Sequence, residues 1–317
     1  METISLVVPC YNEQESITLF YDTVEKVFAG MNKDSKKYVP DYIFINDGSS
    51  DNTLKILNEL HNQHPETVHF ISFSRNFGKE SAITAGLRSA NGDYIALMDV
   101  DLQDPPELLP KMLKIITTED YDCVGCIQTS RKQNPIRAFL SSTFYHVIDR
   151  LSDVKIKPNV RDYRLMTRQY VDAVNDLTEY NRFSKGIFSW VGFNTKYIKY
   201  AGRERAAGET HWSMIQLLEY SIEGIIDFSD APLKVATWVG GLSCFLAVLG
   251  IIFTVIRTIC FGGSVAGWPS LVSIMLLIGG IQLFCLGILG KYIGKIYLET
   301  KHRPNTSLRS KNNEVLN

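Results

Sequence analysis

The chain has 317 residues, of which 45% are hydrophobic, so it is long enough for one large folded domain with additional segments. Its formal net charge at pH 7 is −1, and the lack of an overall positive charge argues against nucleic acid as a partner. Its six cysteines include a Cys-x-x-Cys pair, Cys123 and Cys126, in an apolar run with neither a second pair nor a helix start after it. We therefore expect buried side chains there rather than a redox or metal site.

Residues 1–125 alternate short apolar runs with helical stretches, a pattern that predicts a mostly parallel sheet with helices on both faces. Asn12 is expected to cap the helix after the first strand, and Asp51 to cap the helix that begins near Thr53. Because ligands bind at the carboxyl ends of strands in open α/β sheets, the polar residues that follow each strand predict a nucleotide site at that edge. The expected strands are residues 4–9, 42–45, 68–73 and 94–98.

The segment at residues 96–107 carries the strongest chemical signal, because the fourth strand runs into Asp99 and Asp101 before a turn at two prolines. Side chains alternate along a strand, so the two carboxylates are expected to share one face. Neighbouring carboxylates repel each other unless a cation lies between them. Their oxygens, with the Gln103 amide as a third ligand, favour Mg²⁺ or Mn²⁺ shared with substrate phosphates. The alternatives are a solvated turn and a phosphoryl transferase of the haloacid dehalogenase type.

Two apolar stretches, residues 235–256 and 271–290, carry no formal charge, and each is long enough to cross a bilayer as a helix. Buried helices of a soluble core are the weaker alternative, because these stretches have little polar face. Basic residues flank their outer ends, so the positive-inside rule places both termini and the N-terminal domain in the cytoplasm. The expected division is a domain at 1–212, an amphipathic juxtamembrane helix at 213–232, a transmembrane hairpin at 233–297 and a disordered cytosolic tail at 298–317.

Several motifs in a fixed order resemble those of family 2 glycosyltransferases. They are Val-Val-Pro-Cys-Tyr-Asn-Glu at 7–13, Asn-Asp-Gly-Ser at 46–49, Arg-Asn-Phe-Gly-Lys at 75–79 and Asp-x-Asp-x-Gln-x-Pro-Pro-Glu at 99–107. The likeness is strongest to the polyprenyl-phosphate hexose transferases, the group of dolichol-phosphate mannose synthase and undecaprenyl-phosphate glucosyltransferase, and covers roughly residues 4–300. It implies an α/β fold of GT-A type, Rossmann-like with a mostly parallel sheet, followed by two transmembrane helices. It also argues against the dehalogenase-like reading, whose Asp-x-Asp would follow the first strand of the core.

The resemblance implies a role for residues at each motif. Those expected to bind the nucleotide sugar are Pro9, Tyr11, Glu13, Asp47, Lys79 and Asp99, and those expected to hold Mg²⁺ or Mn²⁺ are Asp99, Asp101 and Gln103. Asp162 would be the catalytic base beside the acceptor. Three structural alternatives stay open: turn formation for Asp47, a solvated position for Lys79, and a salt bridge to Arg161 or Arg164 for Asp162.

A second group of basic residues is expected to bind the acceptor phosphate, because the planar fork of arginine grips phosphate oxygens from two directions. Its members are Arg131, Arg203, Arg205 and His211. His211 stands where the family commonly has lysine, and a neutral imidazole contributes less to anion binding than an ammonium unless a phosphate keeps it protonated.

The leading hypothesis is inverting transfer of one hexose, with glucose from UDP-glucose favoured, to undecaprenyl or dolichyl phosphate at the cytosolic face of the plasma (inner) membrane. Mannose or another sugar is an alternative for the same lipid. A processive polysaccharide synthase would carry Gln-x-x-Arg-Trp and more membrane helices, and a non-catalytic membrane scaffold is the third possibility. The expected partners are the donor, the lipid and the membrane, with self-association and a separate flippase for the lipid-linked sugar as further suggestions.

Overall fold

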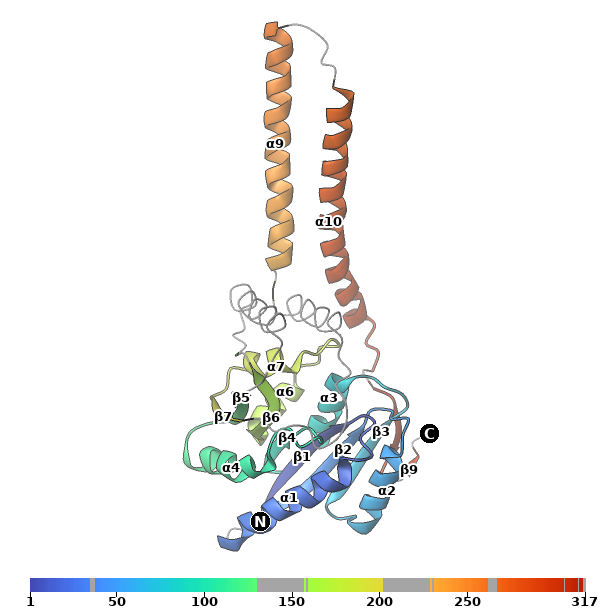
Figure 1. Ribbon diagram of the computed structural model, residues 1–317, viewed down its shortest axis with the longest axis vertical. Coiled ribbons are helices and arrows are strands. Elements are labelled where there is room, and N and C mark those ends of the chain that lie inside the picture. Colours follow the sequence, from blue (N-terminus) through green and yellow to red (C-terminus); the bar gives the residue numbers. More distant parts are fainter. Residues whose placement is uncertain are drawn as a thin grey trace.

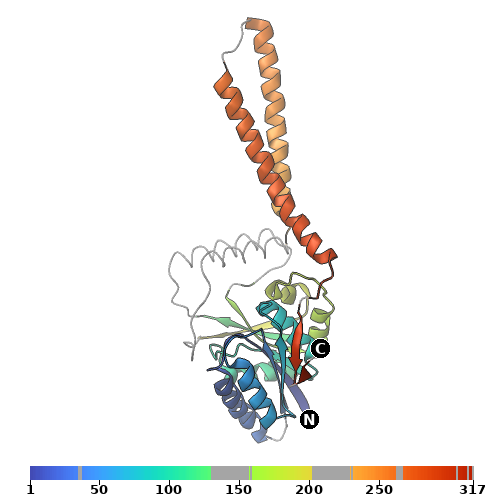
Figure 2. The same cartoon turned by 90° about the vertical axis from the view of Figure 1, so that its right-hand side faces the viewer.

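The computed structural model describes residues 1–34, 38–129, 157, 159–201, 229, 231–261, 267–304, 306–312 and 314–315. Most of them build an α/β domain, and two long helices project from one end of it (Figures 1 and 2). The N-terminus lies at the end of the domain that is far from these helices (Figure 1). The first strand therefore runs toward the helices, and its carboxyl end lies on their side of the domain.

Within the described ranges, the strands form one nine-stranded sheet in the order β7-β5-β6-β4-β1-β2-β3-β8-β9. They are β1 (Glu2–Cys10), β2 (Tyr38–Asn46), β3 (Val68–Phe73), β4 (Tyr94–Leu97), β5 (Cys123–Gln128), β6 (Val160–Thr167), β7 (Thr195–Tyr200), β8 (Leu308–Lys311) and β9 (Glu314–Val315). β1 pairs in parallel with β2 and β4, and β2 pairs in parallel with β3. β6 and β8 run antiparallel to β4 and β3. The four predicted strands thus form the parallel centre of the sheet, with the bounds of β3 as predicted.

Helices cover both faces of this sheet, as the alternating pattern predicted. They are α1 (Ile17–Met31), α2 (Thr53–Gln63), α3 (Lys79–Ser89), α4 (Leu109–Thr118), α6 (Arg168–Asn175) and α7 (Ser184–Trp190). Leu6 and Val8 of β1 belong to the core layer beneath α1, α2 and α4. Val7 belongs to the other layer, with Ile83 and Leu87 of α3. The alternation of side chains along β1 therefore divides the core into two layers.

The paired cysteines of the Cys-x-x-Cys motif lie in these two layers. Cys123 and Cys126 are both buried in β5, and both carry free thiols. Burial raises the pKa of each thiol, and the pKa of Cys126 is raised to about 12. These thiols are therefore protonated core side chains at neutral pH, which confirms the structural interpretation of the motif.

One local prediction at the end of a strand is wrong, and the argument for a second does not hold. Asn12 does not cap a helix, because α1 begins only at Ile17 and Asn12 itself has a left-handed backbone with φ of +55°. The alternation argument for the Asp-x-Asp also fails, because β4 ends at Leu97. Asp99 and Asp101 lie beyond the strand in a turn, so the period of a strand does not decide which way they face.

The two projecting helices are α9 (Ala231–Phe261) and α10 (Trp268–Thr300), and they contain both stretches predicted to cross the membrane. Within the part of the chain that the structure describes, two helical segments are long and apolar enough for a crossing, Ala231–Arg257 and Leu277–Thr300. The protein itself buries neither segment, and Trp238 is 80% exposed. Apolar surface of this extent is stable only when something other than water covers it, which fits a membrane-associated protein.

The tail after α10 differs from the prediction of disorder. Its residues 308–311 form β8, which pairs with β3 at the edge of the sheet, and 314–315 form β9 beside it. The Asn312 side chain accepts a hydrogen bond from the Phe70 N–H at 3.0 Å, and the Ser307 carbonyl accepts one from the Ser74 N–H at 2.9 Å. The tail is poor in apolar residues, but an edge strand is held by its backbone and needs no core of its own.

Candidate active site

Three loops, which follow β1, β2 and β3, interlock at the carboxyl edge of the sheet. The Asn12 side chain in the first loop accepts hydrogen bonds from the N–H and the hydroxyl of Ser50 in the second, at 2.9 and 3.3 Å. Gly48, with φ of +64°, brings the second loop against the third, since a Cβ built on it would lie 2.2 Å from the carbonyl carbon of Arg75. Only glycine fits this position without strain. The polar residues predicted to converge at this edge thus form loops that brace one another.

Asp47 fastens the second loop to the third. It is buried, and its two carboxylate oxygens accept hydrogen bonds from the backbone N–H groups of Phe77 at 2.7 Å and Gly78 at 2.9 Å. Burial raises the pKa of this carboxyl above its ordinary value, although the two amides and the nearby Arg75 act to lower it. The side chain that closes the local turn is Asn46, which accepts from the Ser49 N–H at 3.1 Å. Asp47 therefore fixes the loop that leads into Lys79, and its predicted contact with the nucleotide stays a prediction.

Lys79, the first residue of α3, lies between two carboxylates that are far apart in the sequence. Its Nζ is 2.7 Å from Asp99 Oδ1 and 2.7 Å from Asp162 Oδ2. Burial lowers the pKa of Lys79, but the two carboxylates outweigh it and raise the pKa above its ordinary value. Burial raises the pKa of Asp162, and Lys79, Lys185 and Arg164 together bring it below its ordinary value. Both groups are therefore charged at neutral pH, and the salt bridge of Asp162 is to Lys79 rather than to a neighbouring arginine.

The other two predicted metal ligands lie in the turn after Asp99. Asp101 is buried, with 7% of its surface exposed, and its Oδ1 accepts a hydrogen bond from the Gln103 N–H at 3.1 Å. The Gln103 amide oxygen accepts a hydrogen bond from Arg161 Nη2 at 3.1 Å. Arg161 comes from β6, next to Asp162, so this contact ties the Asp-x-Asp turn to the strand that carries the predicted base.

A buried cluster that supports this turn was missed at the level of sequence. Asp104 accepts a hydrogen bond from Arg161 Nε at 3.1 Å and another from the Tyr200 hydroxyl. Burial raises the pKa of Asp104, whereas Arg161 lowers it. The sequence signal for this cluster is the position of Asp104 between Gln103 and two prolines. No spacing rule, however, would have linked it to arginine and tyrosine on distant strands.

Three predicted donor-binding residues lie at the end of β1. Pro9 is within the strand, Tyr11 is 48% exposed, and Glu13 accepts a hydrogen bond from the Ser16 hydroxyl at 2.8 Å. The Glu13 N–H donates to the Thr53 hydroxyl at 2.9 Å, which joins this loop to the start of α2. The predicted contacts of Pro9, Tyr11 and Glu13 with the nucleotide stay predictions.

The predicted acceptor-binding residues lie outside the described residues. They are Arg131, Arg203, Arg205 and His211. The same holds for nearly all of the predicted juxtamembrane helix at 213–232.

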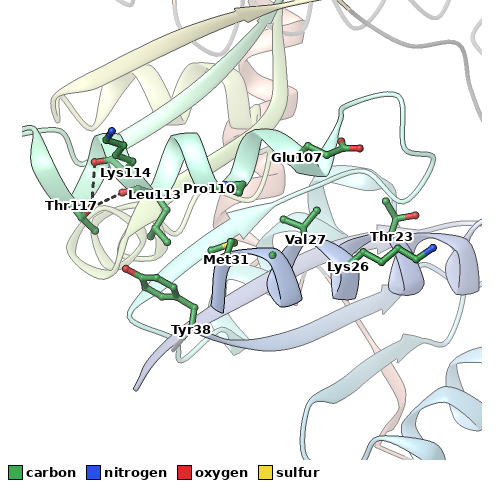
Figure 3. A pocket seen from close by; sticks show the side chains of 11 residues that line it. Thr23, Lys26, Val27, Met31, Tyr38, Glu107, Pro110, Leu113, Lys114 and Thr117 are labelled. Carbon is green, nitrogen blue, oxygen red and sulfur yellow. Dashed lines mark hydrogen bonds between the residues drawn. The ribbon is translucent and has the colours of Figure 1, made fainter. Parts of the chain in front are cut away.

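A cavity of about 680 Å³ lies away from these loops, between α1 and α4 (Figure 3). Its lining includes Val27 and Met31 of α1, Tyr38 at the start of β2, and Leu113 and Lys114 of α4. Among the residues that the structure describes, none that was predicted to bind donor or metal lines it. The candidate active site is therefore the edge at which Lys79, Asp99 and Asp162 meet, and not this cavity.

The residues at that edge fit a hard divalent cation. Asp99 and Asp101 offer carboxylate oxygens, and the Gln103 carbonyl oxygen has a second lone pair besides the one used by Arg161. Within the described ranges, no group of three or more His, Cys, Asp and Glu side chains could hold a metal ion. A two-carboxylate set suits Mg²⁺ or Mn²⁺, which keep waters and take substrate phosphate oxygens, rather than an ion enclosed by protein alone.

Comparison with known proteins gives relatives along nearly the whole chain. This chain is 41% identical over 309 residues to the bactoprenol glucosyl transferase of Shigella phage SfX, and the match covers 97% of this chain and 99% of that one. It is 41% identical over 302 residues to the prophage bactoprenol glucosyl transferase homolog of Escherichia coli K12, covering 95% and 96%. Among solved structures, glucosyl-3-phosphoglycerate synthase from Mycobacterium tuberculosis, in complex with Mn²⁺, UDP and glucosyl-3-phosphoglycerate, is 17% identical to this chain. The match covers 71% of this chain and 78% of that one, with a TM-score of 0.49.

Family models match both parts of the molecule. The GtrB C-terminal hairpin matches residues 231–296, which include α9 and most of α10. Glycosyl transferase family 2 matches residues 5–175, which contain the interlocked loops, the Asp-x-Asp turn and Asp162. The resemblance drawn from the motifs is confirmed, and so is the α/β fold of GT-A type with two apolar C-terminal helices. This chain belongs to glycosyltransferase family 2.

Proposed function

We propose that this glycosyltransferase moves one glucosyl group from UDP-glucose to a polyprenyl phosphate, with inversion at the anomeric carbon. What carries this function is the meeting of Asp99 and Asp162 at one ammonium group, in a domain joined to an apolar helical hairpin. Asp99 belongs to the turn expected to hold the metal and the donor, and Asp162 to the segment expected to face the acceptor. A donor and an acceptor bound to these two residues would lie next to each other.

The relatives support the choice of sugar and of lipid. Two of them, 41% identical to this chain, are named bactoprenol glucosyl transferases or homologs, which favours glucose as the sugar and a polyprenyl lipid as the acceptor. The hairpin would hold the domain at the membrane surface, where the phosphate of such a lipid lies. The basic residues at the outer ends of the two helices favour a cytosolic domain in the plasma membrane. Self-association and a separate flippase stay predictions.

The acceptor needs little help to become a nucleophile. A phosphate monoester has a second pKa near 6, so at neutral pH its oxygens are largely ionised. Asp162, which the nearby cations keep ionised, would then orient the acceptor more than deprotonate it. The predicted acceptor residues Arg131, Arg203, Arg205 and His211 would bind the same phosphate.

The donor side is arranged to receive a diphosphate. Asp101 is buried and Arg161 holds the Gln103 side chain, so these two groups, if they are the ligands, would need little rearrangement to bind a metal. A bound Mg²⁺ or Mn²⁺ would neutralise the charge that develops on the leaving diphosphate. Lys79 would supply a further positive charge beside it.

The test is transfer by the full chain in detergent or nanodiscs. Radiolabelled UDP-glucose is supplied with undecaprenyl phosphate, in the presence and absence of Mg²⁺ or Mn²⁺, and the lipid fraction is counted. We expect lipid-linked glucose only when both metal and lipid are present, and loss of at least about 100-fold in Asp101→Asn. Asp172→Asn is the matched control, because Asp172 is 60% exposed on α6 and pairs only loosely with Arg168, at 3.7 Å.

The competing functions give different products. A panel of UDP-glucose, GDP-mannose and UDP-N-acetylglucosamine identifies the sugar, and preference for another donor would overturn the choice of glucose. A polysaccharide synthase would release a polymer without lipid. A scaffold would bind UDP-glucose without turnover, and this result would reject the proposed enzyme activity outright.

A further inference from the structure

Lys79 contacts a carboxylate oxygen that a metal ion bound by Asp99 would need. Its ammonium contacts Asp99, a predicted metal ligand, and Asp162, the predicted acceptor residue, at 2.7 Å each. Both carboxylates are largely buried, with side-chain exposures of 21% and 19%. Two carboxylates held together and shielded from water need a positive charge between them, and in this state Lys79 supplies it.

The backbone at the start of the lysine side chain is fixed, whereas the side chain as a whole is partly exposed. Gly78, immediately before it, has φ of +94°, and its N–H is held by Asp47 at 2.9 Å. The Lys79 side chain is nevertheless 44% exposed, twice as much as that of either partner. An ammonium on a flexible four-carbon stem can therefore turn to another anion while the backbone stays in place.

A divalent cation and this ammonium compete for the same oxygen. Asp99 Oδ1 is already in contact with Lys79, and like charges at contact distance repel strongly where water is scarce. A metal ion that binds without the donor must displace the ammonium and leave it near a second positive charge. A donor diphosphate changes this balance, because it brings negative oxygens that attract both the ammonium and the metal.

We propose that Lys79 is a resident counter-ion that makes metal binding depend on the nucleotide: it blocks Asp99 in the empty enzyme and releases Asp99 when a diphosphate draws the ammonium away. The inference rests on the proposed function, in that a nucleoside diphosphate is the anion that binds here. The same movement frees Asp162 from its ion pair. The acceptor residue thus becomes available only after the donor and the metal are in place, which limits hydrolysis of the donor in the absence of lipid.

The experiment measures Mn²⁺ binding and needs no turnover. Free Mn²⁺ is followed by electron paramagnetic resonance during titration of the full chain in detergent, with and without UDP. For the native chain we expect weak binding alone and binding at least about tenfold tighter with UDP, a coupling within the usual range. In Lys79→Met, binding without UDP should tighten by about tenfold. The gain from UDP should shrink by the same factor, because the ammonium that UDP would draw away from Asp99 is already absent.

Two further variants make the result specific. Lys185→Met removes a positive charge that also acts on Asp162 but makes no direct contact with Asp99, so its Mn²⁺ binding should match that of the native chain. Lys79→Met combined with Asp99→Asn should lose the tightened binding, which identifies the ligand. Lys79→Gln, a polar replacement that can still donate to both carboxylates, serves if the methionine variant does not elute as a folded protein.

The outcomes that overturn the inference are plain. Unchanged or weaker Mn²⁺ binding in the Lys79 variants without UDP would reject it, and equal tightening in Lys185→Met would reduce it to a general effect of charge. Absence of sugar transfer to lipid, with the Mn²⁺ shifts as expected, would reject the proposed acceptor while leaving the role of Lys79 intact.

Discussion

Replacing Asp47 with asparagine should loosen the loop that leads into Lys79. The carboxylate accepts hydrogen bonds from two backbone N–H groups, those of Phe77 and Gly78, at 2.7 and 2.9 Å. An asparagine side chain offers one acceptor oxygen and turns an NH₂ donor toward the other N–H. One bond to a charged group is therefore lost, and such bonds contribute about 1.5–3 kcal/mol.

This energy translates into the equilibrium between the closed and the open loop. Since about 1.4 kcal/mol corresponds to a factor of ten, local opening of residues 74–79 should become roughly 10- to 150-fold more frequent in Asp47→Asn. Hydrogen exchange followed by mass spectrometry on the full chain reports this opening equilibrium, in peptides that cover Phe77 and Gly78. The faster exchange should stay confined to this loop and its immediate contacts.

Asp51→Asn is the matched control for this change. Asp51 also accepts from two backbone N–H groups, those of Thr53 at 3.0 Å and Gln14 at 3.2 Å, but it does not touch the third loop. Its replacement should speed exchange near residues 14 and 53 and leave residues 74–79 unaffected. Unchanged exchange at 74–79 in Asp47→Asn, or an equal increase there in Asp51→Asn, would refute the bracing role.

Three further predictions concern the same edge of the sheet. Gly48→Ala must keep a left-handed backbone and clash with Arg75, so we expect a loss of at least about 2 kcal/mol, seen as a lower urea midpoint, and an unchanged midpoint contradicts the geometry. Removal of residues 306–317 should speed hydrogen exchange in β3 and lower transfer, whereas native exchange rates would mean that β8 is dispensable. The acid limb of the transfer rate should follow the phosphate of the acceptor near pH 6. Lys185→Met removes a charge that lowers the pKa of Asp162, but it should not move the acid limb, because even an unperturbed aspartate titrates near about 3.9. A shifted acid limb in this variant would instead assign the limb to Asp162.

The sequence predicted the elements of the sheet well, because their signal is local. The apolar run at 68–73 has the observed bounds of β3, and α2 begins at Thr53 as expected. The polar residues after these strands do meet at one edge of the sheet, since parallel strands end there, and their part in binding stays a prediction. These inferences need only the spacing of neighbouring residues.

The partners of the site residues could not be predicted in this way. Asp47 binds amides some thirty positions further on, and Lys79 joins a carboxylate of the segment after β4 to one of β6. The Asp-x-Asp was read with the period of a strand, but Leu102 has φ of +56° and the chain has left the sheet by then. The composition of the tail predicted disorder, but composition does not show that the backbone of β3 has an edge with which the tail can pair.

The pairing of β8 with β3 has a consequence for the passage of the chain through a bilayer. A strand that hydrogen-bonds to the catalytic domain must be in the same compartment as that domain, and β8 follows both apolar helices. If α9 and α10 each cross the membrane, the chain has to return to its starting side, whichever side that is. A compartment reporter fused after Asn317 would therefore show on which side of the membrane the catalytic domain lies, because β8 is paired with β3.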